Sequence, residues 1–253
     1  MSHGTERWEN KVALVTGASA GIGAAVAEQL LARGFRVVGC ARRVSRVEAL
    51  FSRLDPTGTR TMALGVDVRD ESAVLDMFAT ITKRWGGVDV LVNNAGLGHN
   101  ATLLEGDTAQ WKEMFDVNVI ALCVCSREAV KSMRTRGTEG HIIHISSMSG
   151  HRNPGGSGMY SATKYAVRSL TEGLRMEIHA AELPIRVTAI SPGFVETEFA
   201  AHYHKSETKA EETYSRYKVL EAVDIAESVL YAVSCPLHMQ VHDVLIRPTA
   251  QPS

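Results

Sequence analysis

The sequence has no surplus of either charge and no long apolar run, and each shortage excludes a class of protein. Its 27 Lys and Arg residues are matched by 28 Asp and Glu residues, so the formal net charge is −1 with the histidines neutral. Proteins that bind nucleic acids or membrane surfaces usually carry a basic surplus or a polybasic segment, so neither partner is expected. The longest apolar run, at 119–125, is far shorter than the ~20 residues that cross a bilayer.

Cysteine is also scarce, and the N-terminal residues lack the apolar stretch of a signal peptide. The four cysteines show neither the density of a disulfide scaffold nor the C-x-x-C spacing of a metal site. The closely spaced histidines at 141 and 144 and at 202 and 204 lack a carboxylate or cysteine partner at ligand spacing, so no metal is expected. The sequence therefore predicts a soluble, cytoplasmic protein whose cysteines are reduced packing residues.

Short β-branched runs alternate with long helical patterns along almost the whole chain. Strands are expected at 12–16, 36–40, 62–66, 88–92, 141–146, 185–190 and 241–246. Helices are expected at 21–33, 45–54, 71–85, 108–136, 158–181 and 222–234. Apolar strands separated by helices favour a parallel sheet that is buried on both faces. We predict an α/β fold: a single Rossmann-type domain over 1–253, with a doubly wound parallel sheet of about seven strands and ligands at their carboxyl ends.

One segment, 196–218, departs from this alternation. It is charged and rich in tyrosine, and it follows a strand directly. It shows no strand pattern and at most one helix, near 207–217. Such a segment is either a solvated surface excursion or a lid over a substrate pocket, and its position at a strand end favours the lid.

The first strand ends in a glycine-rich turn that leads directly into a helix, Thr16-Gly17-Ala18-Ser19-Ala20-Gly21-Ile22-Gly23. Glycines let the backbone approach a pyrophosphate, and the free amides of the helix N-terminus favour its charge. The alternative is a tight turn that requires only a positive φ. Its place after the first strand of a βαβ unit favours a dinucleotide site.

The second strand ends in Cys40-Ala41-Arg42-Arg43, and no acidic residue stands between Phe35 and Val47. A site for the unphosphorylated cofactor would place Asp or Glu there, on the ribose hydroxyls. Guanidinium groups instead suit a 2′-phosphate. The sequence therefore favours NADP(H), and the alternative is a pair of solvated arginines at the start of a helix.

Tyr160 and Lys164 stand one helical turn apart, and Ser147 precedes the tyrosine by thirteen residues at the end of a buried strand. A nearby ammonium stabilises a phenolate, so we expect Lys164, helped by the positive charge of an oxidised nicotinamide, to lower the pKa of Tyr160 from its ordinary value near 10. Tyr214 and Lys218 repeat this spacing, but Ala201 stands thirteen residues before Tyr214 and offers no hydroxyl. The first pair is therefore the candidate catalytic pair.

From about residue 8 to its C-terminus the chain resembles the short-chain dehydrogenase/reductase superfamily. The matching motifs are the glycine loop 16–23, Asp67-Val68, Asn93-Asn94-Ala95-Gly96, Asn118, Ser147, Tyr160 with Lys164, Pro192-Gly193 and Thr197. The catalytic residues implied are Asn118, Ser147, Tyr160 and Lys164. Together with the arginines, the expected cofactor-binding residues are Gly17, Ser19, Ala20, Gly21, Ile22, Gly23, Arg42, Arg43, Asp67, Val68, Asn93, Ala95, Gly96, Tyr160, Lys164, Pro192, Gly193, Val195 and Thr197.

The resemblance also implies a role for each catalytic residue. The tyrosine is the acid and base, and the serine orients the carbonyl. The lysine binds the nicotinamide ribose and lowers the pKa of the tyrosine, and the asparagine anchors a proton-relay water.

It further implies where the cofactor contacts the chain. Asp67 and Val68 flank the adenine, Asn93 and Gly96 border the cofactor groove, and Thr197 contacts the nicotinamide end.

Within that superfamily the chain looks like the animal dehydrogenase/reductase family member 11 group, which resembles carbonyl and ketosteroid reductases and has insect relatives described as farnesol dehydrogenases. The residues that carry this likeness are at 6–8, 39–42, 147–152 and 246–251. The superfamily's usual T-G and D-G-G around the last strand are absent, and 238–247 with a proline-containing tail replaces them. Pocket closure and assembly through the C-terminus therefore do not transfer from the superfamily at large.

Apolar side chains cluster in sequence around the expected pocket mouth, at Met148, Met159, Phe194, Phe199 and Tyr203. Together they suggest an apolar substrate cavity. A small-molecule hydrophobic carbonyl or alcohol is the expected partner, and the resemblance favours bulky ones such as ketosteroids or farnesol-like alcohols. We therefore predict an NADP(H)-dependent oxidoreductase, expected as a homo-oligomer, either a dimer or a tetramer. The alternatives are a 3-oxoacyl-carrier reductase of lipid metabolism and a catalytically silent nucleotide-binding sensor.

Overall fold

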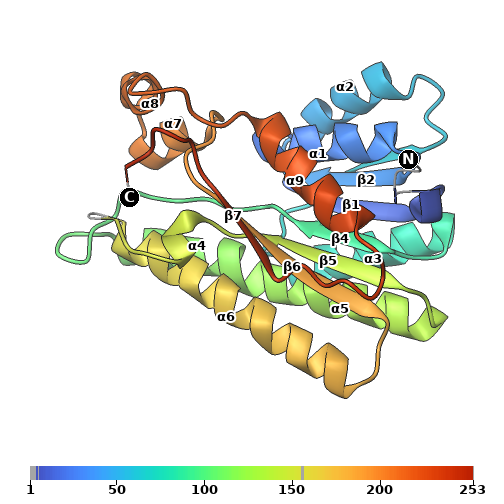
Figure 1. Ribbon diagram of the computed structural model, residues 1–253. Helices are drawn as coiled ribbons and strands as arrows, with labels where there is room; N and C mark the ends of the chain where they lie inside the picture. Colours follow the sequence, from blue (N-terminus) through green and yellow to red (C-terminus); the bar gives the residue numbers. More distant parts are fainter. Residues whose placement is uncertain (1–3, 5, 155–156, 253) are drawn as a thin grey trace.

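The computed structural model describes residue 4, residues 6–154 and residues 157–252, so the extreme ends of the predicted domain lie outside the described residues. Seven strands form one parallel sheet in the order β3-β2-β1-β4-β5-β6-β7 (Figure 1). The strands are β1 (Val12–Thr16), β2 (Arg36–Ala41), β3 (Thr61–Gly65), β4 (Val90–Asn93), β5 (Gly140–Ile145), β6 (Ile185–Pro192) and β7 (Asp243–Ile246). The predicted doubly wound α/β fold is confirmed. The strand order reverses direction between β1 and β4, where open α/β sheets bind ligands.

Helices cover both faces of the sheet. They are α1 (Gly21–Ala32), α2 (Val44–Leu54), α3 (Glu71–Trp85), α4 (Thr108–Phe115), α5 (Ala121–Arg136), α6 (Gly158–Ala180), α7 (Phe199–His204), α8 (Glu207–Tyr214) and α9 (Ala222–Ser234). Figure 1 shows α1, α2 and α9 on one side of the sheet and α5 and α6 on the other.

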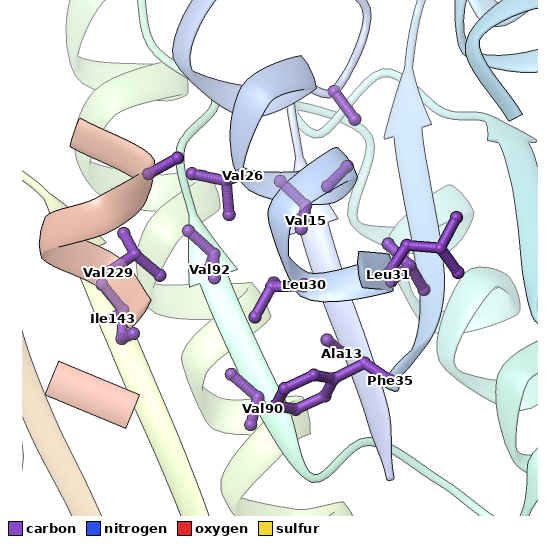
Figure 2. Packing of buried hydrophobic residues seen from close by; sticks show 14 of the residues in the cluster. Ala13, Val15, Val26, Leu30, Leu31, Phe35, Val90, Val92, Ile143 and Val229 are labelled. Atoms are coloured by element: carbon purple, nitrogen blue, oxygen red, sulfur yellow. The ribbon is translucent and has the colours of Figure 1, made fainter. Parts of the chain in front are cut away.

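Successive strand residues pack into two separate cores, as the period of a strand requires. Ala13 and Val15 of β1 belong to the core beneath α1, whereas Val12 and Leu14 belong to the opposite core. Figure 2 shows part of the first core, with side chains of α1 and α9 against β1, β4 and β5. Burial on both faces explains why the strands read as continuous apolar runs.

Two expectations about helices need correction. The single helix expected at 108–136 is interrupted by a π-helical segment, Asp116–Ile120, between α4 and α5. The segment at 196–218 contains two helices rather than at most one, because a positive φ of 52° at Lys205 ends α7 and the Ser206 hydroxyl then caps α8. The six residues of α7 are too few to show a helical period.

All four cysteines are free, and Cys40, Cys125 and Cys235 are buried. Burial raises the pKa of Cys125 to about 12, so its thiol is protonated at neutral pH. These cysteines therefore serve packing, as expected. In the described residues, no helix combines the length and the apolar character needed to cross a membrane.

Candidate active site

The sequence motifs meet in one large cleft at the carboxyl ends of the strands. Its volume is about 1390 Å³, which exceeds the range typical of pockets for a single drug-sized ligand. Every expected cofactor-binding residue lines this cleft except Gly23 and Asn93. The cleft therefore has room for a dinucleotide and a substrate together.

Two glycines shape the turn between β1 and α1. Gly17 and Gly21 have positive φ angles of 69° and 53°. A Cβ atom at Gly17 would lie 2.9 Å from the Ala95 Cα, and one at Gly21 would lie 2.9 Å from the Thr197 Cγ2. No side chain caps the N-terminus of α1, so its first amides are available to an anion. This cradle fits a pyrophosphate.

Gly23 does not line the cleft as expected. A Cβ atom there would lie 2.4 Å from both the Gly17 carbonyl oxygen and the Asn94 Nδ2. Gly23 therefore permits close packing behind the turn and does not contact a ligand.

Asn93 was expected to border the cofactor groove, and the structure corrects this. Its amide is buried and donates hydrogen bonds to the Ser126 Oγ at 2.9 Å and to the Leu122 carbonyl at 3.4 Å. The next residue, Asn94, lines the cleft instead and donates to the carbonyl oxygens of Thr16 and Gly17. Adjacent residues at the end of β4 point to opposite faces, which explains why Asn94 lines the cleft and Asn93 does not.

Arg42 and Arg43 both line the cleft beyond the end of β2. The Arg43 Nη2 lies 2.8 Å from Glu198 Oε2 and 3.5 Å from the Ser19 Oγ of the glycine turn. Arg46, one helical turn further on, places its Nη1 2.5 Å from Glu198 Oε1. The two guanidinium groups hold the pKa of Glu198 below its usual range. Sequence reasoning missed Glu198, because 155 residues separate it from Arg43.

Asp67 and Val68 line the cleft after β3, as expected. Arg69 places its Nη2 2.6 Å from the Asp67 Oδ2. Hydrogen bonding from Arg69 holds the pKa of Asp67 below its usual range, so the carboxylate is charged at neutral pH.

Ser147, Tyr160 and Lys164 come together from β5 and α6. Ser147 directly precedes a short 3₁₀ helix, Met148–Gly150, and its hydroxyl accepts a hydrogen bond from the Ser149 amide at 3.0 Å. The Lys164 Nζ lies 5.8 Å from the Tyr160 ring centroid and donates to the Ile145 carbonyl at 3.0 Å. All three residues line the cleft.

The chain's own groups do not by themselves lower the pKa of Tyr160. Burial raises the pKa of Tyr160 above its ordinary value, and a hydrogen bond with Ser147 offsets only part of that rise. Burial also lowers the pKa of Lys164 from 10.5 to about 8. The protein's own groups therefore keep the Tyr160 phenol protonated at neutral pH.

Asn118 lies in the π-helical segment, and its side chain does not line the cleft. Its Oδ1 accepts from the Leu97 amide at 2.9 Å, and its Nδ2 donates to the Leu97 carbonyl and to the Thr163 Oγ1. A Cβ atom at Gly96 would lie 3.3 Å from the Asn118 Oδ1 and 3.8 Å from the Lys164 Nζ. Asn118 is therefore close to Lys164 and is fixed by the backbone after β4.

An aromatic cluster formed by Tyr160, Phe199 and Tyr203 covers the same end of the cleft. The ring centroids of Phe199 and Tyr203 lie 5.4 Å and 6.3 Å from that of Tyr160. A Cβ atom at Gly98 would lie 2.8 Å from each of the two α7 rings, so these rings pack directly on the loop after β4.

Four of the five expected substrate-pocket residues line the cleft. Met148 and Phe194 do so beside the two α7 rings. Met159 does not, because it is rotated by about 100° around α6 from Tyr160.

Two further elements of the cleft had no sequence signal. The Tyr214 hydroxyl donates to the Thr197 carbonyl at 3.1 Å and accepts from the Thr197 amide at 3.4 Å, so the end of α8 holds the start of the 196–218 segment in place. The tail after β7 returns to the cleft, where the Gln251 Oε1 accepts from the Phe194 amide at 3.1 Å. Sequence reasoning treated Tyr214 as a spacing coincidence and did not anticipate either contact.

No group of three or more His, Cys, Asp or Glu side chains in the described ranges could hold a metal ion. His151 directly follows the 3₁₀ helix Met148–Gly150. Its Nε2 lies 3.0 Å from the Asp243 Oδ2 and 3.2 Å from the Ser191 Oγ. These contacts tie the loop after Ser147 to β6 and β7.

Comparison with known proteins gives a consistent result. Residues 11–208 match the family model described as short chain dehydrogenase. The dehydrogenase/reductase SDR family member 11 of Homo sapiens is 50% identical over 254 residues, which cover 98% of this chain and 98% of that protein. The farnesol dehydrogenase of Aedes aegypti is 43% identical over 250 residues, which cover 97% of this chain and 99% of that protein. A closed form of serine dehydrogenase complexed with NADP⁺ superposes with a TM-score of 0.90 at 33% identity, over 96% of each chain.

Proposed function

Because this chain belongs to the short-chain dehydrogenase family and is an oxidoreductase, we propose that it interconverts a carbonyl and an alcohol with NADP(H). One observation carries the proposal: the side chains of Ser147, Tyr160 and Lys164 line the same cleft as the glycine turn that fits a pyrophosphate. A silent nucleotide-binding protein would need the turn but not the three side chains.

The chain's own residues supply the acid and the orientation for carbonyl reduction. A bound nicotinamide would supply the hydride. The Ser147 hydroxyl donates a hydrogen bond to the carbonyl oxygen, which fixes the substrate beside the tyrosine. The Tyr160 hydroxyl then gives its proton to that oxygen as negative charge develops there. Burial keeps Tyr160 protonated at neutral pH, which suits a proton donor.

Lys164 and Asn118 are proposed to restore the proton. Lys164 is buried at the floor of the cleft, and its lowered pKa of about 8 makes transfer of its own proton less costly. Asn118 is held by the Leu97 backbone after β4, and in this proposal it anchors the water that returns a proton to Lys164. In oxidation of an alcohol, the same residues carry the proton in the opposite direction.

The preference for a phosphorylated cofactor rests on Arg42 and Arg43, whose side chains line the cleft where the chain has no acidic residue between Phe35 and Val47. The serine dehydrogenase with the same fold was solved with NADP⁺, which supports this assignment.

The substrate is proposed to be a bulky hydrophobic ketone or alcohol. Phe199 and Tyr203 surround Tyr160 with aromatic surface, and Phe194 lies half-exposed in the same cleft. A relative described as a farnesol dehydrogenase supports an apolar substrate. In this proposal 196–218 is the lid of a single domain that spans the chain.

A homo-oligomer is also proposed. The apolar side chains of Ile120, Tyr165 and Met176 are exposed on the π-helical segment and α6, and a second copy could cover them. Light scattering with size-exclusion chromatography tests this part.

A substrate panel tests the proposed reaction. Ketosteroids, dicarbonyls and terpenoid alcohols are assayed with NADPH or NADP⁺ and with NADH or NAD⁺, using the wild type and Ser147→Ala. We expect turnover of at least one bulky apolar compound with the phosphorylated cofactor, and loss of that turnover in the variant. Turnover that survives in Ser147→Ala would contradict the assigned site.

A further inference from the structure

Glu198 connects the lid to the arginines of the proposed phosphate site. Its two carboxylate oxygens are divided between Arg43, at 2.8 Å, and Arg46, at 2.5 Å. Arg43 and Glu198 both line the cleft, and the same Arg43 Nη2 also reaches the Ser19 hydroxyl of the glycine turn. The Glu198 carboxylate is therefore already paired with Arg43, the guanidinium group that faces the glycine turn.

The backbone before Glu198 is held in place on both sides. The Tyr214 hydroxyl bonds both backbone groups of Thr197, and the Thr197 Oγ1 accepts from the Phe199 amide at 3.2 Å. The Thr197 methyl group packs so closely on Gly21 that no side chain fits there. These contacts define the position of Glu198 relative to the glycine turn.

We propose that Glu198 sets how strongly this protein selects NADP(H) over NAD(H), by competing with the 2′-phosphate for Arg43. The inference rests on the proposed cofactor preference. A 2′-phosphate carries more than one negative charge and requires the same guanidinium group. It must therefore displace Glu198, which breaks the ion pairs with Arg43 and Arg46, or bind beside it, which brings like charges together. The unphosphorylated cofactor meets no such opposition.

Glu198 thus supplies from the lid the carboxylate that the chain lacks between 35 and 47. In dinucleotide sites an acid at this place favours the unphosphorylated cofactor. The protein would therefore combine arginines that attract the phosphate with a carboxylate that limits this attraction. The ion pairs are half-exposed, at 44% and 42% for Arg43 and Glu198, so the expected effect is moderate.

Titration of the full-length protein with 2′,5′-ADP and 5′-AMP isolates the contribution of the phosphate. In Glu198→Gln we expect 2′,5′-ADP to bind about 3- to 10-fold more tightly, the worth of one or two exposed ion pairs. The affinity for 5′-AMP should stay within about twofold. In an Arg43→Ala background the gain should shrink to under about twofold, because the shared partner is gone.

Glu211→Gln is the matched control, since Glu211 is an exposed lid residue of α8 outside the cleft lining and its replacement changes the net charge equally. The unfolding midpoint of each variant checks that it is folded. Unchanged or weaker binding of 2′,5′-ADP by Glu198→Gln would overturn the inference, as would an equal gain in Glu211→Gln. If the wild type binds 2′,5′-ADP no better than 5′-AMP, the proposed cofactor preference itself is wrong.

Discussion

The Lys164 ammonium lies 5.8 Å from the centre of the Tyr160 ring and donates its hydrogen bond to the backbone of Ile145. Lys164 is buried and Tyr160 is partly buried, and desolvation favours the neutral form of each. At neutral pH the folded protein therefore holds a buried ammonium at Lys164, which lowers its stability.

We predict that Lys164→Met is inactive but more stable at neutral pH. The pKa of Lys164 is about 8 in the folded chain against an ordinary value of 10.5, so below pH 8 the buried ammonium lowers the free energy of unfolding by up to about 3 kcal/mol. Between pH 8 and 10.5 the unfolded chain binds the extra proton, and wild-type stability rises with pH.

Urea unfolding of both proteins at pH 7 and pH 10 measures this effect. The advantage of Lys164→Met should be largest at pH 7 and should shrink toward pH 10. A variant that is less stable at both values would show that the ammonium is compensated within the fold.

Tyr160→Phe should lose at least ~10²-fold in kcat, because a positioned acid contributes about that much. Binding of NADPH should remain. Tyr165→Phe is the matched control, since Tyr165 is exposed on the same helix, and its kcat should be unchanged. Steady-state kinetics with one ketone substrate suffice, and comparable losses in both variants would assign the acid to another residue.

Arg42→Ala should raise the Kd for NADPH by about 10- to 150-fold, since one charge-assisted contact contributes about 1.5 to 3 kcal/mol. The Kd for NADH should hardly change. Fluorescence titration with each cofactor measures both constants. If the wild type binds NADH as tightly as NADPH, the arginines do not bind the 2′-phosphate.

Phe199→Ala and Tyr203→Ala should each narrow the preference for bulky substrates while sparing cofactor binding. Burial of apolar surface contributes about 25 cal/mol per Å², so a steroid-sized ketone should exceed acetone by orders of magnitude in kcat/KM. The ratio of the two kcat/KM values is measured in the wild type and both variants. A ratio near one in the wild type, or an unchanged ratio in both variants, would show that the aromatic cluster does not contact substrate.

The sequence predicted the sheet well because its inner strands are buried on both faces. Val37, Val38 and Cys40 of β2 are all fully buried, so no polar side chain follows Arg36 in this strand and the run differs clearly from the helical patterns beside it. The motifs at the strand ends lie together in the cleft because the carboxyl ends of parallel strands share one edge of the sheet.

The contacts of the 196–218 segment could not be predicted in this way. Its contacts join residues that are distant in the chain, such as Glu198 with Arg43, or depend on a single hydroxyl, such as Tyr214 with Thr197. The motif at the end of β4 was also hard to interpret, because Asn94 and not Asn93 faces the cleft. A motif gives the position of a turn, whereas the side of the sheet that each residue faces depends on the exact end of the strand.

Glu198 and Phe199 are consecutive residues, yet one contacts the arginines beyond β2 and the other contacts Tyr160. An insertion or deletion at this junction would shift both contacts at once. Under the roles proposed for Glu198 and Phe199, a change in this segment that adapts the protein to a new substrate also alters its choice of cofactor. A lid grafted from a relative has to preserve the register of these two positions if only one specificity is to change.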